Sequence, residues 1–286
     1  MENQIDASKL VRVLRENIEL KLSELAMPNE IQSYFQKLAS VSEDNLPSGI
    51  SDAEYRFVLA LQSNLFHKRQ ELDWAIGLML LFSELGPDTP YFWLFETFGD
   101  FEKEGKPRAE YNSGFWQGVG DCTVKICSFF DALGGYLAFV FFGLIENPLY
   151  FHQVMESLRG KHSWSYKLKQ PDRIQLIQEG DPFNLDEFVG WEILWESRNR
   201  YQELKIWRNT FIHNFSPMLR TRYFDTHIDW LTYDALVPFL AKLSSLEVKS
   251  RLIEHYFFAR LARLGAAQIA EGYCKTGSYH RNYYHA

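Results

Sequence analysis

Three residues near the end of a long, apolar-patterned stretch have types that could do chemistry: Arg208, Asn209 and His213. Arginine presents a permanent planar cation that matches two oxygens of a phosphate. Histidine, with an unperturbed pKa of about 6.5, can both accept and donate a proton near neutral pH. Together they suit cleavage of an RNA phosphodiester by its own 2′-hydroxyl, which requires no metal. The alternative, which needs no function, is that both residues complement the dipole at a helix C-terminus.

A long amphipathic helix is the element that has to position these residues. Apolar and aromatic side chains recur at steps of three and four from Phe188 to Ile212, which indicates one buried helical face. Asn184 and Glu187 have the spacing of a capping box at the start of the helix. Pro217 prevents further helix at the other end. The chemistry therefore falls in the last turns of this helix.

Spacing along a helix decides which of the three side chains can meet. Arg208 and His213 lie roughly 140° apart around the axis, so they do not share a face, although the arginine is long enough to reach around. Asn209 and His213 are one turn apart and do share a face. A hydrogen bond between them would orient the imidazole and select its tautomer. We therefore expect Arg208 to hold the phosphate, His213 to transfer protons and Asn209 to orient His213.

The pattern of Arg208, Asn209 and His213 resembles the Arg-polar-x3-His motif of the HEPN superfamily, whose members are all-helical ribonuclease and nucleotide-binding domains. In that superfamily the motif lies at the end of a long helix of a bundle, and the resemblance covers residues 113–264. It implies a metal-independent endoribonuclease that acts as a homodimer, with Arg208 and His213 catalytic and Asn209 supporting them. A symmetric dimer would supply the second proton-transfer group, because one motif offers one histidine.

The resemblance also implies partners and a role. An RNA substrate is expected, together with an antitoxin or other regulatory partner and a role as a toxin or in phage defence. Many HEPN toxins have a tyrosine two residues after the histidine, whereas this chain has Phe215. Modification of that tyrosine by an antitoxin is therefore not expected here. The alternative function is a non-catalytic helical module that binds a nucleotide, RNA or a protein; in a third interpretation Arg208 and His213 only cap a structural bundle.

The composition is that of an ordinary globular protein with an acidic balance. The 286 residues carry a net charge of −7 with a pI of about 5.7, which argues against a general electrostatic grip on nucleic acid. Cys122, Cys127 and Cys274 are too few for a disulfide framework and lack neighbouring ligands for zinc. The N-terminus has no continuous apolar core of the secretory kind. We therefore expect a cytoplasmic protein with reduced thiols that uses no metal and no cofactor.

A basic segment with interleaved aromatic residues follows a short helix expected at 148–158. Lys161, Trp164 and Lys167 belong to it, and Arg198 adds positive charge on the motif helix. Cations next to aromatic rings are the composition expected of a contact with single-stranded nucleic acid. We therefore predict that these four residues bind substrate. The alternative for the segment is a solvated surface loop.

The most apolar segment of the chain, 129–145, falls in a helix expected at 113–146. It is at the short limit for a membrane span and Asp131 interrupts it, so a buried bundle helix is favoured and no membrane association is expected. A charge in an apolar setting is costly and requires a partner. We expect Asp131 to bond near Arg208 or His213 and to belong to the substrate-binding residues, or to make a structural salt bridge elsewhere. Lys125 either faces a phosphate or is solvated.

These observations together predict an all-α protein. Its expected parts are an N-terminal helical segment with its connector at 1–112, a HEPN-like helical bundle at 113–270 and a tail at 271–286. The aromatic connector at 87–114 is expected to pack on the core, with base stacking as the alternative. The expected helices are 5–25, 28–41, 52–85, 91–98, 113–146, 148–158, 188–212, 227–246 and 247–270.

Overall fold

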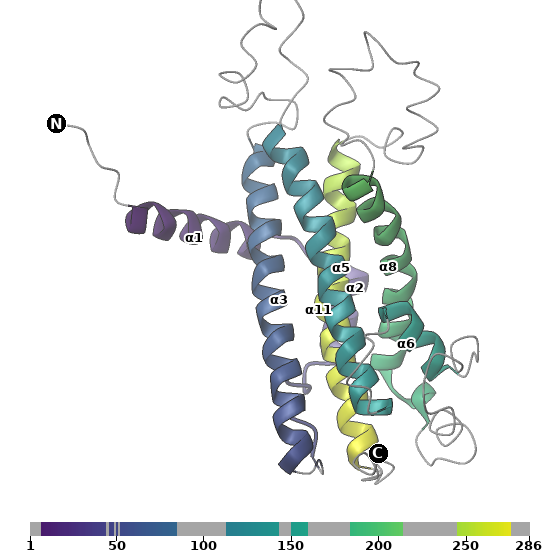
Figure 1. The fold of residues 1–286 in the computed structure, drawn as a ribbon. Helices are drawn as coiled ribbons and strands as arrows, with labels where there is room; N and C mark the ends of the chain where they lie inside the picture. The colour runs from purple at the N-terminus through teal and green to yellow at the C-terminus, as the bar shows by residue number, and fades with distance from the viewer. Residues whose placement is uncertain are drawn as a thin grey trace, which may run out of the picture. The chain divides into compact units, whose positions relative to one another are not determined.

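The computed structural model describes residues 7–43, 46–48, 50, 52–84, 113–142, 150–159, 184–213 and 245–275. Figure 1 shows that these ranges are built from helices, and no β-strand occurs within them. The all-α class that the hydrophobic periodicity predicts is therefore confirmed. The elements are α1 (Ala7–Ser23), α2 (Asn29–Lys37), α3 (Asp52–Glu84), α5 (Ser113–Phe142), α6 (Phe151–Leu158), η4 (Leu185–Glu187), α8 (Val189–His213) and α11 (Ser245–Lys275).

Two long helices match their predicted bounds, one short helix ends early and the last one is longer at both ends. α2 ends at Lys37 instead of at 41, and α11 begins at Ser245 instead of at 247. α3 and α8 begin and end within one residue of the prediction. α11 continues to Lys275 instead of stopping at Ala270. The reason is that Tyr273 is only 4% exposed and packs against Phe141 of α5, with ring centroids 4.5 Å apart. The helix expected at 91–98 and residues 227–244 of the helix expected at 227–246 lie outside the described residues. The helix boundary predicted between 246 and 247 is wrong, because both positions belong to α11.

The start of α8 differs from a simple capping box. Asn184 Oδ1 accepts a hydrogen bond from the backbone N–H of Asp186 at 3.2 Å, and Asn184 Nδ2 donates to Glu187 Oε1 at 3.1 Å. These bonds close the short 3-10 turn η4, and α8 itself begins at Val189. The two predicted capping residues therefore do interact, but they cap the turn that precedes the helix.

The described helices contribute to two compact units, each treated separately below. Helices α3, α5, α8 and α11 have residues in both units. A single division at about residue 112, which the sequence suggests, stays a prediction. Unit 1 comprises Met1–Ala26, Glu71–Lys125 and Ile206–Ile253, and unit 2 comprises Met27–Gln70, Ile126–Lys205 and Glu254–Ala286.

Glycines allow close helix contacts in unit 1. Ile18 of α1 is 3% exposed, and its side chain occupies the space that a Cβ on Gly77 of α3 would need. A Cβ on Gly118 of α5 would come within 3.1 Å of the Cα of Met79. The absence of a side chain at these two positions therefore lets α1 and α5 lie directly against the second half of α3.

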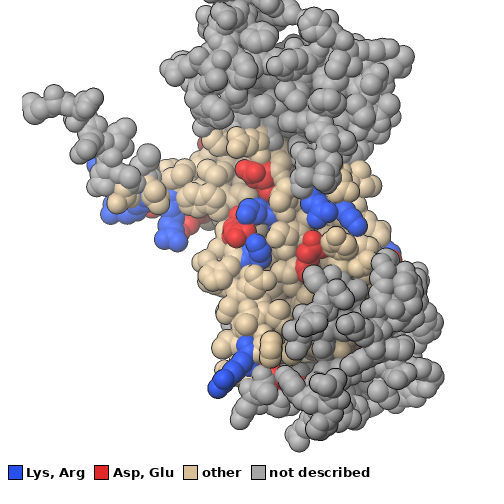
Figure 2. All heavy atoms as spheres, in the orientation of Figure 1, with Lys and Arg blue, Asp and Glu red and all other residues tan. Residues whose placement is uncertain are grey.

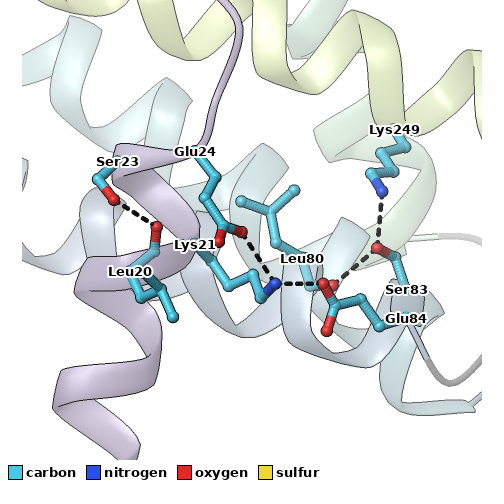
Figure 3. Close-up of polar contacts among 8 residues, drawn as sticks. All are labelled: Leu20, Lys21, Ser23, Glu24, Leu80, Ser83, Glu84 and Lys249. Carbon is cyan, nitrogen blue, oxygen red and sulfur yellow. Dashed lines mark hydrogen bonds and ion pairs between the residues drawn. The ribbon is translucent and has the colours of Figure 1, made fainter.

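Polar contacts add orientation to this packing (Figure 3). Lys21 Nζ lies 3.0 Å from Glu24 Oε2 and 2.5 Å from Glu84 Oε1. The hydrogen bond to Glu84 is the main reason why the pKa of Lys21 is raised above its ordinary value. Lys249 Nζ donates to Ser83 Oγ at 2.8 Å, which ties α11 to the end of α3. Such exposed contacts contribute little free energy, so they select an orientation more than they stabilise the unit.

Aromatic side chains from α5, α6 and α8 build the core of unit 2, and a ring of α3 packs on it from the surface. Phe130 of α5 and Phe151 of α6 are fully buried with ring centroids 5.0 Å apart. Tyr201 of α8 meets both rings edge-on, at 5.9 and 5.8 Å. On α3, Phe57 stacks on Phe139 of α5 at 5.8 Å. Contacts with these offset and edge-to-face geometries stabilise a core beyond the area that they bury. They fix α8 against α5 and α6 within this unit.

Two glycines bring α8 and α11 together, backbone to backbone, in unit 2. A Cβ added to Gly190 would meet the carbonyl oxygen of Gly265 at 2.5 Å, and a Cβ added to Gly265 would meet that of Gly190 at 2.7 Å. The N–H of Gly190 also donates to Gln268 Oε1 at 2.8 Å. No side chain fits between the two helices at this point. The glycine that interrupts the pattern of the motif helix is therefore the position at which that helix is fixed on α11.

The apolar helix α5 is mostly buried. Among the described residues, its stretch Gln117–Phe142 has the length and composition of a membrane span, and 67% of the qualifying window is buried inside the protein. A core helix of a bundle meets the same criteria. Cys122 and Cys127 lie buried on this helix and Cys274 lies buried on α11, and none of these three cysteines forms a disulfide. Burial is also the main cause that raises the pKa of Cys274 to about 12.

Candidate functional site

The last turns of α8 carry the predicted motif. Trp207 is only 1% exposed, so its indole holds this end of the helix in the core. Arg208 is half-buried and Asn209 is exposed. Arg208 Nη2 lies 3.4 Å from Asn209 Oδ1, which is longer than the usual hydrogen bond and indicates a weak one. The guanidinium and the amide are therefore close enough to contact one ligand.

His213 is the last residue of α8. The backbone is helical from Asn209 to His213, so the two positions are one turn apart, as the four-residue spacing predicts. The side chains of residues 210–213 are outside the described part of the structure. The hydrogen bond between Asn209 and His213, and the convergence of Arg208 and His213 on one phosphate, therefore remain predictions.

Lys125, predicted as a substrate contact, forms an ion pair in unit 1. Its Nζ lies 2.8 Å from Glu71 Oε2, and the two side chains are 38% and 39% exposed. One turn earlier on α5, partial burial raises the pKa of Asp121, while Lys125 acts in the opposite direction. Exposed pairs of this kind are weak. A phosphate contact by Lys125 is still a prediction, and Glu71 would compete with the ligand.

Asp131 has the partner that its apolar surroundings require. Its Oδ1 accepts a hydrogen bond from the hydroxyl of Tyr201 at 2.6 Å, and Tyr201 is fully buried on α8. A hydroxyl that donates to a carboxylate at this length forms one of the stronger hydrogen bonds in proteins. This contact joins α5 to the motif helix within unit 2. Both expectations for Asp131, a bond near Arg208 or His213 and a structural salt bridge, stay predictions.

Arg198, also predicted to bind substrate, is engaged with α6. Its Nη2 forms an ion pair with Glu156 Oε1, and the two side chains are 14% and 17% exposed. The guanidinium lies 4.9 Å from the ring centroid of Trp195, and that of Arg159 lies 4.2 Å from the same ring. The charge of Arg198 is therefore largely compensated by Glu156, and a direct role in substrate binding stays a prediction.

The remaining predictions concern the basic segment and metal ions. Lys161, Trp164 and Lys167 lie outside the described residues, and their contact with nucleic acid stays a prediction. Within the described ranges, no group of three or more His, Cys, Asp or Glu side chains is placed to hold a metal ion. On the face drawn in Figure 2, cationic and anionic side chains lie next to each other among the described residues.

Three rings in unit 2, which the sequence does not single out, form a stack. Tyr150 and His152 have ring centroids 6.0 Å apart at an interplanar angle of 15°, and His152 and Tyr201 have centroids 5.8 Å apart at 24°. Tyr201 is fully buried, whereas Tyr150 is 45% exposed. The stack therefore runs from the core to the surface. Sequence gives no local signal for it, because Tyr201 is far from the other two in the chain.

The imidazole in the middle of this stack is kept neutral. Burial is the main cause that lowers the pKa of His152 below its ordinary value of 6.5. Lys205 and Arg198 lower it further, and Glu156 acts in the opposite direction. Nδ1 of His152 is buried and has no hydrogen-bond partner in the described part of the structure. A buried polar nitrogen in this state is uncommon in proteins.

Comparison with known proteins leaves the function open: no family model, no curated protein and no solved structure matches this chain. An all-helical architecture supports many unrelated activities. The function therefore has to be argued from the side chains, and two places offer chemistry: the motif at the end of α8 and the stacked rings of unit 2.

Proposed function

We propose that this protein is a metal-independent endoribonuclease of HEPN type, with Arg208 and His213 as its catalytic residues. The observation that supports it most is the setting of Arg208, whose half-buried guanidinium lies beside Asn209 in the last turns of a helix that ends at His213. Trp207 anchors the same turns in the core. Catalytic groups on a rigid element are held more accurately than groups on a loop.

The chemistry divides among the three residues. His213, as general base, takes the proton of the RNA 2′-hydroxyl, which attacks the adjacent phosphorus. Arg208 stabilises the negative charge that develops on the non-bridging oxygens, and Asn209 orients the imidazole. The bond to the 5′-oxygen breaks and leaves a 2′,3′-cyclic phosphate and a 5′-hydroxyl. The leaving oxygen needs a proton, which His213 of a second subunit would supply across a homodimer. The proposal includes a cytoplasmic location and an antitoxin or other regulatory partner.

The first test is cleavage of mixed RNA by the purified chain in the presence of a chelator. His213→Ala and Arg208→Ala should each reduce the rate by at least about a hundredfold, because each removes a proton-transfer or charge-stabilising group. The products should carry 2′,3′-cyclic phosphate ends. His67→Ala is the matched control, because His67 is an exposed histidine of α3 and should leave the rate unchanged.

Two results would contradict this role. Cleavage by His213→Ala at the wild-type rate would assign the activity to another site or to a contaminant. Cleavage that stops on chelation would assign it to a metal. Circular dichroism of each variant shows whether a loss of activity reflects chemistry or unfolding.

The second candidate function is a non-catalytic module that binds RNA. The specific observation in its favour is the stack of Tyr150, His152 and Tyr201, which pairs an exposed ring with nearby cations and requires no cleavage to be useful. This function predicts tight RNA binding without any cyclic phosphate product. The same purified protein therefore separates the two functions.

A further inference from the structure

The strongest unassigned feature of the structure is a group of rings and cations between α6 and α8 in unit 2. It consists of the stack described above and the side chains around it, and we name it the α6–α8 face. Its residues are Tyr150, His152, Arg159, Trp195 and Lys205.

The rings of this face are fixed at one end and open at the other. Tyr201, against which His152 stacks, is held by its hydrogen bond to Asp131 and by the phenylalanines of the core. At the open end Tyr150 is 45% exposed, and its backbone N–H donates to Gln153 Oε1 at 3.0 Å, which fixes the start of α6. An exposed ring on a rigid base offers a further flat partner a stacking surface at little entropic cost.

One cation lies at this open end and another lies further along the face. Lys205 Nζ lies 4.8 Å from the ring centroid of Tyr150. Arg159 lies over the ring of Trp195 at the other end of α6, and Trp195 and Lys205 are about 15 Å apart along α8. Neither Lys205 nor Arg159 forms an ion pair with another residue that the structure describes. Two nearby carboxylates are engaged elsewhere, since Glu156 pairs with Arg198 and Asp131 accepts from Tyr201. Among the described residues, the positive charge of Lys205 and Arg159 therefore remains available to an anion, although the whole chain is acidic.

A neutral histidine completes the face. Its Nδ1 is closed to solvent and has no hydrogen-bond partner in the described part of the structure. The imidazole therefore contributes to the face as a flat, uncharged ring between two tyrosines, on which the exposed ring of Tyr150 is supported.

We propose that the α6–α8 face binds single-stranded RNA, with a base stacked on Tyr150, the phosphate of that base held by Lys205, and a phosphate further along the strand held by Arg159. Stacking on aromatic rings beside a cationic track is how proteins bind single strands without sequence preference. A flat stack with free cations favours a nucleobase with its phosphate over an acidic peptide. The choice of RNA as the ligand rests on the proposed ribonuclease function, but binding here does not require cleavage.

The test measures binding alone, with the full chain and a fluorescent 2′-O-methyl oligonucleotide of roughly ten nucleotides, a length within the range of single-strand sites. A 2′-O-methyl group removes the nucleophile, so the ligand stays intact. Tyr150→Ala should raise Kd about tenfold or more. Lys205→Ala should weaken binding and lower the salt dependence by about one phosphate contact, a slope change of about 0.7. Tyr150→Phe keeps the ring and should bind like the wild type.

Two variants serve as matched controls. Tyr55→Ala removes a tyrosine that is 44% exposed on α3, almost the same exposure as Tyr150. Lys37→Ala removes a lysine whose Nζ lies 5.1 Å from the ring centroid of Tyr34 on α2, the same kind of contact as that of Lys205 with Tyr150. Both controls should change Kd less than twofold. Thermal unfolding of all variants shows whether the fold is preserved.

The outcomes separate this inference from the ribonuclease proposal. If the wild type binds the oligonucleotide and Tyr150→Ala and Lys205→Ala bind equally well, the inference is wrong, whatever the cleavage assay shows. No binding by the wild type also overturns it. If both variants lose binding and the controls do not, the inference holds. It then holds even where His213→Ala leaves cleavage unaffected or no cleavage occurs, results that would refute only the nuclease.

Discussion

Two lysine–tyrosine pairs in unit 2 have nearly the same geometry but opposite surroundings. The distance from the lysine Nζ to the ring centroid is 5.1 Å for Lys37 and Tyr34 and 4.8 Å for Lys205 and Tyr150. The hydroxyl of Tyr34 donates to Glu192 Oε1 at 2.7 Å. Tyr150 instead stacks on an imidazole. The same contact thus occurs once beside a carboxylate and once in an aromatic stack.

The electrostatic effects of the two settings differ in direction. Around Tyr34, the hydrogen bond to Glu192 is the main cause that raises the pKa to about 12, and burial and further carboxylates add to it. Around His152, burial and then the charge of Lys205 lower the pKa. One helix supplies both environments, with Glu192 near its start and Lys205 near its end. A cation over a ring therefore does not identify an anion site; the charges around it do.

The largest change in the free energy of unfolding should come from breaking the glycine contact between α8 and α11. Helix α8 carries residues of both settings, so both depend on this contact. Gly190→Ala would place a Cβ 2.5 Å from the carbonyl oxygen of Gly265, and backbone cannot yield as a side chain does. We expect the free energy of unfolding to fall by about 1–3 kcal/mol or more. Gly135→Ala is the control, since a Cβ there meets nothing within 4 Å, and it should be neutral or stabilise by up to about 1 kcal/mol. Urea unfolding of both variants measures the difference, and equal midpoints would contradict it.

A smaller change should distinguish the two tyrosine hydroxyls. Tyr201→Phe removes the buried donor to Asp131 and should lower the free energy of unfolding by about 1–3 kcal/mol. Tyr34→Phe removes an exposed donor to Glu192 and should cost less than about 1 kcal/mol. Thermal or urea unfolding compares the two. A larger loss for Tyr34→Phe would mean that the acidic setting carries more of the stability of unit 2 than the aromatic one.

The smallest expected effect is on the pH dependence of the free energy of unfolding. The pKa of His152 is lower in the folded protein than the ordinary value of 6.5, so on acidification the unfolded chain binds the proton first. The free energy of unfolding is therefore not reduced by this group above pH 6.5, and it decreases as pH falls from 6.5 through the pKa of the folded protein. His152→Phe should remove this loss and leave stability at pH 8 unchanged or higher. By NMR titration, Lys205→Ala should raise the pKa of His152 and Glu156→Gln should lower it. A pKa that does not respond to either variant would place these charges outside the stack.

Helix positions followed well from sequence because they depend on local pattern. The spacing of apolar residues located α3 and α8 within one residue. The end of α11 was missed because Tyr273 is held by Phe141, and a ring contact over such a distance in the chain leaves no local trace. Asn184 and Glu187 do interact, but the pattern could not distinguish a cap on α8 from a cap on a short 3-10 turn.

The contact partners of the candidate site residues were harder to predict from the sequence than the helix positions. The apolar surroundings of Asp131 predicted that it has a partner, but not that the partner is Tyr201. Arg198 was predicted to meet substrate from its charge alone, and Glu156, which pairs with it, lies on another helix. His152 gave no signal, because its neutral state depends on burial and on Lys205. The catalytic roles of Arg208 and His213 stay predictions, because the side chain of His213 lies outside the described part of the structure.

The paired glycines also bear on how the α6–α8 face adapts to its ligand. Packed helices usually slide or rotate by exchanging side-chain rotamers at their contact. Where Gly190 meets Gly265 there are no rotamers to exchange, so α8 has little freedom to move against α11. Helix α6 is held as well, because Phe151 packs in the core against Phe130 and Tyr201. Adaptation to larger and smaller bases therefore falls to the exposed ring of Tyr150, and the surface that the ligand meets is set by the fold before the ligand arrives.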